Sequence, residues 1–330
     1  MDGDALKLEI LRRLFRQFGF AVALLAAMPF AGIAATKQGQ TTSLPGYKAV
    51  RVRYSSQNRM ITAARINGYP ATLIVDTGGR QTILESSAAE SFSVSPSRPG
   101  FRYGGLRYTG FTQINGQTYP VSFVKTFAVG DVNFGSTLVA LRDSSSRHTL
   151  SNGDVHIDGV LGRDILTRQK VIINCGTRLI FFKVDPSRQL QLARFAESQS
   201  FTRVPLRQEE NGALTVPYSI NGRPSRLVVD TGAGLTTLDE SKIKSLGITL
   251  EPTGAKARFT TGLVQHISLA QINNLTLGDF KVRPTKLGAA ALPSFAIQQG
   301  ATRIDGILGL ELLVICHAII DFDSMSLFLK

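Results

Sequence analysis

The stretch that decides the fold is "LIVDTGGRQT", residues 73–82. The apolar or β-branched residues from Thr72 to Val75 lead directly into Asp76, which is typical of a buried strand that ends on an acidic side chain. A charge that closes an apolar strand costs free energy unless another group uses or compensates it. Because Asp and Gly are also ordinary turn residues, one Asp-Thr-Gly triplet fits either a surface turn or half of a catalytic pair.

The sequence contains a second copy of this stretch. Residues 65–84, "RINGYPATLIVDTGGRQTIL", recur as "SINGRPSRLVVDTGAGLTTL" at residues 219–238, an offset of 154 without a gap. Further along, "DGVLGRDIL" at residues 158–166 matches "DGILGLELL" at residues 305–313, and the new offset of 147 also aligns the segments that follow. Since the matches occur in the same order, the chain is an internal duplication.

The duplication predicts two units joined by a polar linker. The chain has 330 residues and 43% apolar content, which is enough to build two cores. Each unit has the pattern of a strand, an Asn-Gly hairpin, a strand ending in Asp-Thr-Gly, several strands between glycines, a short helix and a closing strand pair, so we expect a mostly β fold. The predicted division is residues 1–34 as a signal peptide or membrane anchor, 35–47 as a flexible segment, 48–183 as lobe 1, 184–203 as a linker with a short helix, and 204–330 as lobe 2.

The N-terminus has the pattern of an export signal. Residues 12–16 include three arginines and precede the uncharged stretch 17–36, and Gly-Ile-Ala at residues 32–34 offers the small side chains that a signal peptidase reads. The uncharged stretch is also long enough to span a bilayer, so a membrane tether through residues 17–36 stays open as the alternative. In both cases we expect the body of the protein to be exported: periplasmic, secreted, or membrane-anchored and facing outward.

Composition argues against several other classes of protein. The formal net charge of +13 is spread along the chain, without a basic stripe interleaved with aromatic residues, so nucleic acid is not an expected partner. The four histidines have no zinc-ligand spacing and no phosphate-binding glycine loop appears, so we expect neither a metal nor a cofactor. Cys175 and Cys316 lie in apolar neighbourhoods, which favours buried thiols and leaves a single disulfide open.

Two Asp-Thr-Gly triplets, each followed about 80 residues later by two apolar residues and a glycine, resemble the aspartic protease superfamily. The segment "GRDILTRQ" at residues 162–169 is similar to the Gly-Arg-Asp/Asn helix start of the retropepsins, the retroviral-type branch, and Ala233 also fits that branch. The resemblance covers residues 60–183 and 214–330. It implies a bilobal fold of two retropepsin-like β-barrel lobes, related by a pseudo-two-fold axis and paired within one monomeric chain.

The resemblance also implies the residues of an active site. Asp76 and Asp230 would share one proton and activate a water molecule that attacks the peptide bond of an extended peptide or unfolded protein. Hairpins over the substrate would act as flaps, adding the peptide to the protein as an extra strand. The supporting residues would be Thr77, Gly78, Thr231 and Gly232, with Val160-Leu161-Gly162 and Ile307-Leu308-Gly309 beneath them, and the flap residues would be Tyr103 or Tyr108, Gly104, Gly105, Phe259 and Gly262.

Two positions depart from the family pattern. Members usually place Ser or Thr two positions after the catalytic glycine, whereas this chain has Arg80 and Gly234. A guanidinium near Asp76 would favour its ionised form and bias the shared proton onto Asp230, or it would mark a lobe specialised for binding. The sequence therefore predicts an aspartic endopeptidase, with a catalytically impaired, retropepsin-like peptide-binding module of the cell envelope as the alternative. A third reading is that each unit pairs with its twin in another molecule.

Other polar residues of the repeats are expected to be structural. Asp158 and Asp305 precede glycine in both units and are interpreted as turn acids, while Arg163 and Asp164 are expected to tie the start of a helix to neighbouring backbone.

Overall fold

The computed structural model describes residues 43–97, 99–100, 102–103, 106–107, 110–143, 156–258, 263–299 and 302–330. Thr41–Lys330 forms one compact unit that contains both repeats. The predicted signal peptide (1–34), the predicted tether (17–36) and most of the flexible segment 35–47 lie outside the described residues. None of the described helices combines the length and the apolar character that a membrane span needs.

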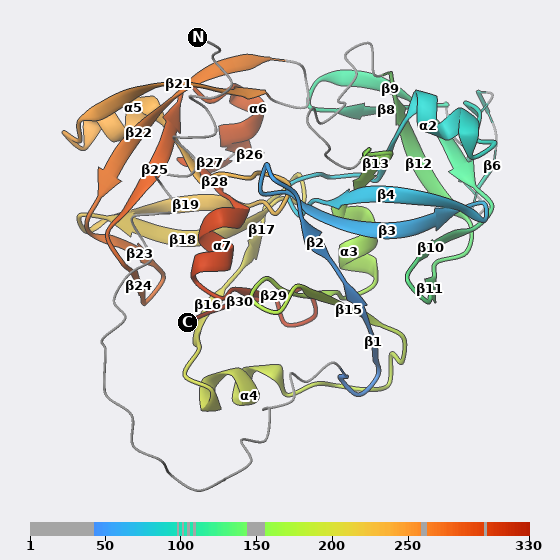
Figure 1. The fold of residues 1–330 in the computed structure, drawn as a ribbon, viewed down its shortest axis with the longest axis horizontal. Helices are drawn as coiled ribbons and strands as arrows, with labels where there is room; N and C mark the ends of the chain where they lie inside the picture. The colour runs from blue at the N-terminus through green and yellow to red at the C-terminus, as the bar shows by residue number, and fades with distance from the viewer. Residues whose placement is uncertain are drawn as a thin grey trace, which may run out of the picture. The chain divides into compact units, whose positions relative to one another are not determined.

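The first repeat is built on a ten-stranded sheet (Figure 1). Its strands are β2 (Arg53–Tyr54), β3 (Met60–Ile66), β4 (Tyr69–Val75), β5 (Ile83–Glu85), β8 (Phe111–Ile114), β9 (Gln117–Val124), β10 (Phe127–Val129), β11 (Val132–Asn133), β12 (Thr137–Arg142) and β13 (Gly159–Leu161). They pair in the order β11-β10-β3-β4-β13-β5-β12-β9-β8, and β2 joins β3. The ends of this path, β11 and β8, each pair on one side only, so the sheet is open and the expected β-barrel closure is wrong.

The second repeat forms another ten-stranded sheet with the same connectivity. Its strands are β17 (Arg207–Gln208), β18 (Leu214–Ile220), β19 (Arg223–Val229), β20 (Thr237–Asp239), β21 (Leu250–Arg258), β22 (Val264–Ile272), β23 (Leu275–Leu277), β24 (Phe280–Val282), β25 (Thr285–Ala290) and β28 (Gly306–Leu308). The order β24-β23-β18-β19-β28-β20-β25-β22-β21, with β17 on β18, repeats the first sheet strand for strand and is also open. The two halves of the duplicated sequence therefore fold with the same strand topology.

The Asn-Gly hairpins predicted from sequence are confirmed. Asn67 and Gly68 turn β3 into β4 with Ile66 paired to Tyr69, and Asn221-Gly222 turns β18 into β19 in the same way. Both residues of each turn have positive φ, as a two-residue hairpin turn requires. The second strand of each hairpin buries alternate residues in the main core and ends at the Asp-Thr-Gly loop.

A six-stranded sheet contains strands from both repeats. It consists of β1 (Tyr47–Arg51), β14 (Ile172–Asn174), β15 (Leu179–Lys183), β16 (Thr202–Pro205), β29 (Ile319–Asp321) and β30 (Ser326–Leu329), in the order β1-β15-β14-β29-β30-β16. Figure 1 shows it below the two large sheets. At its centre Ile173 of β14 pairs with Ile320 of β29, and these two residues are equivalent at the offset of 147. The pseudo-two-fold axis therefore passes through this pair.

Short helices and hairpins complete the chain. The helices predicted after the apolar-Gly segments and in the linker are confirmed as α3, α7 and α4, and the cysteines Cys175 and Cys316 are buried free thiols. The helices are α2 (Ser86–Ser91), α3 (Arg163–Arg168), α4 (Leu192–Ser198), α5 (Glu240–Ser245), α6 (Ser294–Ile297) and α7 (Leu310–Ile315), and the separate hairpins are β6 (Arg102–Tyr103) with β7 (Leu106–Arg107) and β26 (Gln298–Gln299) with β27 (Thr302–Arg303).

The shared sheet predicts that the two repeats unfold together. Ile320 is fully buried at its centre, so Ile320→Ala should lower the free energy of unfolding by about 2–5 kcal/mol, because the truncation removes apolar contacts and leaves a cavity. Urea denaturation followed by circular dichroism would measure this loss. The variant should show one transition at lower urea; two separated transitions would mean that the repeats are independent folding units.

Candidate active site

The two Asp-Thr-Gly loops start from equivalent points of the two large sheets. β4 ends at Val75 and β19 ends at Val229, so Asp76 and Asp230 are the first residues beyond their strands. The N–H of Asp76 donates to Leu161 O (3.1 Å) and the N–H of Asp230 donates to Leu308 O (3.0 Å). The segments 160–162 and 307–309 therefore support the loops from the neighbouring strands, as the resemblance implies.

Two buried threonines fasten the loops to each other. The N–H of Thr77 donates to Thr231 Oγ1 (3.1 Å), and the hydroxyl of Thr77 donates to Val229 O (2.7 Å). The reciprocal bonds run from Thr231 N to Thr77 Oγ1 (3.0 Å) and from Thr231 Oγ1 to Val75 O (2.7 Å). Both threonine side chains are fully buried. Each hydroxyl therefore donates once and accepts once across the axis between the repeats, which fixes the separation of the loops.

The glycines of the triplets allow the two carboxyl groups to approach. A Cβ on Gly78 would lie 2.4 Å from the Cγ of Asp230, and a Cβ on Gly232 would lie 2.6 Å from the Cγ of Asp76. Real Cβ atoms do not tolerate such distances, so any other residue at either position would push the loops apart. Each loop thus lies directly against the acid of the other repeat.

The structure places the carboxyl groups of Asp76 and Asp230 close together, each against the glycine of the opposite triplet. Oδ1 of Asp76 accepts from the N–H of Gly79 (2.6 Å), and Oδ1 of Asp230 accepts from the N–H groups of Gly232 (2.8 Å) and Ala233 (3.1 Å). Burial, the charge of Asp76 and the hydrogen bond between the two side chains raise the pKa of Asp230 well above its ordinary value. Both aspartates nevertheless remain partly exposed.

Two arginines lie within electrostatic reach of this pair. Nη1 of the buried Arg163 donates to the carbonyl oxygens of Thr77 and Gly78 (3.1 Å each), which is the predicted tie between the helix start and neighbouring backbone. Burial lowers the pKa of Arg163, while the charges of Asp76 and Asp230 raise it. Burial likewise lowers the pKa of Arg59, while the charges of Asp76 and Asp230 raise it. Sequence reasoning missed Arg59, because a single arginine in a turn forms no pattern.

The two departures from the family pattern have separate explanations. Arg80 is exposed, and its charge acts on Arg163, whose pKa it lowers. Gly234 is required by packing, since a Cβ there would lie 2.4 Å from Gln57 O of the first repeat. The backbone N–H groups of Gly79 and Ala233 each donate a hydrogen bond to the acid of their own loop.

The predicted flap residues lie mostly outside the described part of the chain. Tyr103 lies in β6, which pairs with β7. Gly104, Gly105, Tyr108, Phe259 and Gly262 lie outside the described residues. Val124 pairs with Thr137 in the first repeat as Ile272 pairs with Thr285 in the second, so the β8–β9 pair is the counterpart of the β21–β22 pair. The flap assignment stays a prediction.

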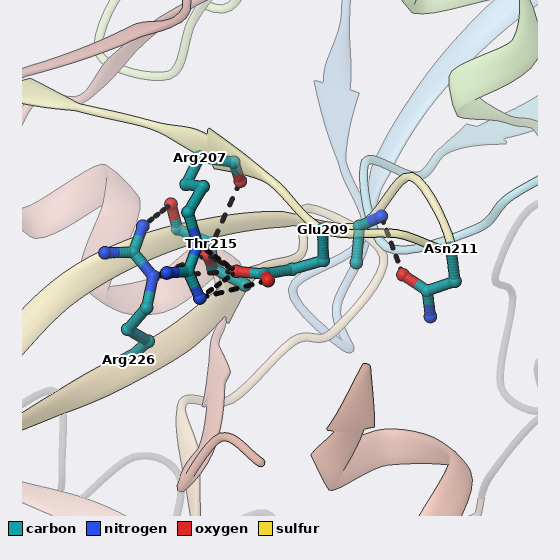
Figure 2. Close-up of polar contacts among 6 residues, drawn as sticks. Arg207, Glu209, Asn211, Thr215 and Arg226 are labelled. Atoms are coloured by element: carbon teal, nitrogen blue, oxygen red, sulfur yellow. Dashed lines mark hydrogen bonds and ion pairs between the residues drawn. The ribbon is translucent and has the colours of Figure 1, made fainter. Parts of the chain in front are cut away.

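A turn in the second repeat is held by a charged cluster (Figure 2). Glu209 accepts from Arg207 Nε (2.8 Å) and from Thr215 Oγ1, and Arg226 Nε in turn donates to Thr215 Oγ1 (2.7 Å). The turn continues through Asn211, whose Oδ1 accepts from Ala213 N (3.0 Å). A Cβ at the intervening position 212 would lie 3.7 Å from Arg163 Nη2, so this turn lies beside the active loops.

The remaining polar residues singled out in the sequence have structural partners. Asp158 accepts from the N–H of Thr72 (2.7 Å), and Asp305 accepts from the hydroxyl of Tyr218 (2.7 Å), so their interpretation as structural acids is confirmed. Asp164 accepts from the N–H (3.0 Å) and hydroxyl (2.8 Å) of Thr82. Within the described part of the chain, no group of three or more His, Cys, Asp or Glu side chains is arranged to hold a metal ion.

The chain belongs to the aspartyl protease family, whose model matches residues 62–165 and 216–312. Solved structures similar to it include the aspartic proteinase from Irpex lacteus (14% identity, TM-score 0.48, 86% of this chain and 97% of that chain covered). Another is Basic 7S globulin from soybean (13% identity, TM-score 0.47, 86% and 93% covered). A comparison with curated protein sequences gave no match. The family and the paired aspartates define an aspartic-protease-like protein with two lobes in one chain.

The second repeat replaces Asp164 by a longer acid, Glu311. Oε1 of Glu311 accepts from the N–H of Thr236 (2.6 Å), as Asp164 accepts from Thr82. The extra methylene leaves Oε2 buried without a hydrogen-bond partner among the described residues. Burial raises the pKa of Glu311 from 4.5 to about 7. The ionised form of this side chain therefore destabilises the folded protein.

This acid predicts a pH dependence of stability. The pKa of Glu311 is higher in the folded protein than in the unfolded chain, so the folded state binds this proton more tightly. The free energy of unfolding therefore falls as the pH rises from below 4.5 through 7. Glu311→Gln should remove this contribution. The free energy of unfolding of the variant, relative to wild type, should therefore rise by roughly 3 kcal/mol between pH 4.5 and pH 8. Urea unfolding at both pH values would measure the difference. Glu251→Gln, at an exposed glutamate, is the control; equal effects of the two substitutions at both pH values would contradict the prediction.

Proposed function

We propose that the protein is an aspartic endopeptidase in which Asp76 and Asp230 activate water for peptide-bond hydrolysis. The single observation that carries the proposal is the close approach of two partly exposed carboxyl groups, each packed against the glycine of the opposite triplet. Two carboxylates in contact cannot both ionise cheaply, so such a pair holds one proton and supplies an acid and a base at the same point. Membership of the aspartyl protease family makes peptides the substrate class.

In the proposed mechanism Asp230, whose pKa is raised, supplies the proton of the pair, and Asp76 acts as the base. In the first step Asp76 takes a proton from water while the resulting hydroxide attacks the carbonyl carbon of the peptide bond. Asp230 gives its proton to the carbonyl oxygen, so a neutral gem-diol forms and the charge moves from Asp76 to Asp230. No covalent bond to the protein is formed.

The second step returns the pair to its starting state. Asp76 donates its new proton to the amide nitrogen, the carbon–nitrogen bond breaks, and Asp230 takes a proton back from a gem-diol hydroxyl. The products are a free acid and a free amine. The backbone N–H groups of Gly79, Gly232 and Ala233 orient the carboxyl groups throughout, because they bond to the inner oxygens.

Catalysis is preferred over the binding-module alternative because of what surrounds the pair. The binding module was suggested by Arg80, whose guanidinium would have paired with Asp76. Arg80 is exposed, and no hydrogen bond or ion pair joins it to another described residue. Reciprocal threonine bonds and backbone donors hold both carboxyl groups in place, which supports a working pair. We place this activity outside the cytoplasm on the strength of the N-terminal pattern.

Replacing either acid should abolish hydrolysis. Asp76→Asn and Asp230→Asn should each lower kcat/KM on an unfolded casein-like substrate by at least about 10²–10⁴-fold, because each removes one half of the acid–base pair. Wild-type activity should be greatest at acidic to mildly acidic pH and should decline once Asp230 loses its proton. Peptide release measured by mass spectrometry would follow both effects.

The control for this experiment is Asp279→Asn, which removes an exposed carboxylate in the turn between β23 and β24. It should cleave as wild type does. If all three variants cleave at the wild-type rate, the mechanism is wrong. Binding of a statine-type inhibitor without cleavage of any substrate would instead identify the protein as a peptide-binding module.

A further inference from the structure

The turn that precedes β3 carries a charged side chain to the active loops. The N–H of Ser55 donates to Arg59 O (2.9 Å), and the N–H of Arg59 donates back to Ser55 Oγ (3.1 Å). These bonds close the turn 55–59 on itself. Arg59 is therefore held at a fixed point of the backbone, one residue before the buried strand begins.

The same turn is attached to the opposite repeat. Nδ2 of Asn58 donates to Gly234 O (3.3 Å), and Gln57 O is so close to Gly234 that no side chain fits there. The backbone of Arg59 thus lies beside the Asp-Thr-Gly loop of the second repeat, while its charge acts on Asp76 of the first repeat as well as on Asp230. The turn that carries Arg59 therefore lies at the junction of the two repeats.

The guanidinium of Arg59 has no partner of its own. Within the described residues no hydrogen bond or ion pair from it is present, although the side chain is half-buried. Other arginines of this region are satisfied: Arg163 bonds to two carbonyl oxygens and Arg142 to Glu85. Figure 2 shows the same for Arg226, which bonds to Thr215 beside Glu209. A partly desolvated guanidinium that makes no bond to the protein is costly, and a carboxylate is its best complement.

Asp76 and Asp230 both act electrostatically on Arg59 and on Arg163. Arg163 is buried and bonded to the loops, whereas Arg59 keeps part of its surface exposed. Of these two cations, Arg59 is therefore the one that a ligand can reach.

The duplicated position in the second repeat has no charge. At the offset of 154, Arg59 corresponds to Ala213, which is buried in an apolar cluster with Val228 and Ile304. The two turns are otherwise alike, since Glu209 N donates to Ala213 O as Ser55 N donates to Arg59 O. The two sides of the site therefore differ in charge although they share a backbone.

We propose that Arg59 is a specificity-determining residue that binds an acidic side chain of the peptide substrate, on one side of the scissile bond only. The proposal rests on the proposed function and adds the chemistry of the preferred peptide. A planar guanidinium with free N–H groups binds a carboxylate through two parallel hydrogen bonds, which a neutral amide cannot reproduce. We therefore expect preferred substrates to carry one acidic residue near the scissile bond. The equivalent substrate position on the other side of that bond should show no preference for an acidic residue.

The test uses non-cleavable statine peptides in matched pairs that carry Glu or Gln at one position on either side of the statine. Calorimetry on the full chain should show one position at which Glu binds about 10–100-fold more tightly than Gln. Arg59→Gln should reduce that ratio to about 3-fold or less, and Arg59→Lys should keep part of it, because an ammonium retains the charge without the fork of donors. Thermal melting would verify that both variants are folded.

The control variant is Arg51→Gln, which removes one positive charge from an exposed position in β1 and should leave the Glu preference unchanged. Equal binding of Glu and Gln peptides at every position, a Glu preference that survives Arg59→Gln, or no binding of any peptide overturns the proposal. The proposed function is judged separately by cleavage. A protein that shows the Arg59-dependent preference but cleaves nothing supports this inference and refutes the endopeptidase.

Discussion

The exchange of hydrogen bonds between Thr77 and Thr231 is the constraint on which the site depends. Each hydroxyl bonds to the backbone of the opposite repeat, so neither loop can shift without breaking bonds in both. A buried hydroxyl that loses its partner costs more than the bond itself contributed. This rigidity is what keeps two mutually repelling acids close together, and burial together with the charge of Asp76 raises the pKa of Asp230.

Much of the fold and the centre of the site could be predicted from the sequence, because they are encoded in repeated local patterns. The Asn-Gly turns, the strands that end at Asp76 and Asp230, and the helices after the apolar-Gly segments each have a short-range signal. Because these signals occur in the same order in both halves of the chain, they could be assigned to one repeated unit. Arg163 and Asp164 were expected at a helix start tied to neighbouring backbone, and Arg163 bonds to the carbonyl oxygen of Thr77 while Asp164 bonds to Thr82.

What could not be predicted depends on contacts between distant segments. The six-stranded sheet joins β1 and β16 to the closing strands of their repeats, and nothing in those short segments specifies their neighbours. The closure into barrels was expected from family resemblance and is absent, since closure depends on how the edge strands meet. Arg59 gave no signal because its importance arises from the position of its turn, which Asn58 attaches to Gly234 of the other repeat.

The pairing of Ile173 with its own equivalent, Ile320, bears on how such a protein arises. A contact that lies on a two-fold axis can be made by two separate copies of one repeat, so a homodimer of a single lobe could use the same sheet. Joining the copies in one chain makes their association intramolecular and independent of protein concentration. Fusion also frees each copy to change alone. In a homodimer any charge near the acids would occur twice, whereas here the first repeat carries Arg59 and the second retains an alanine.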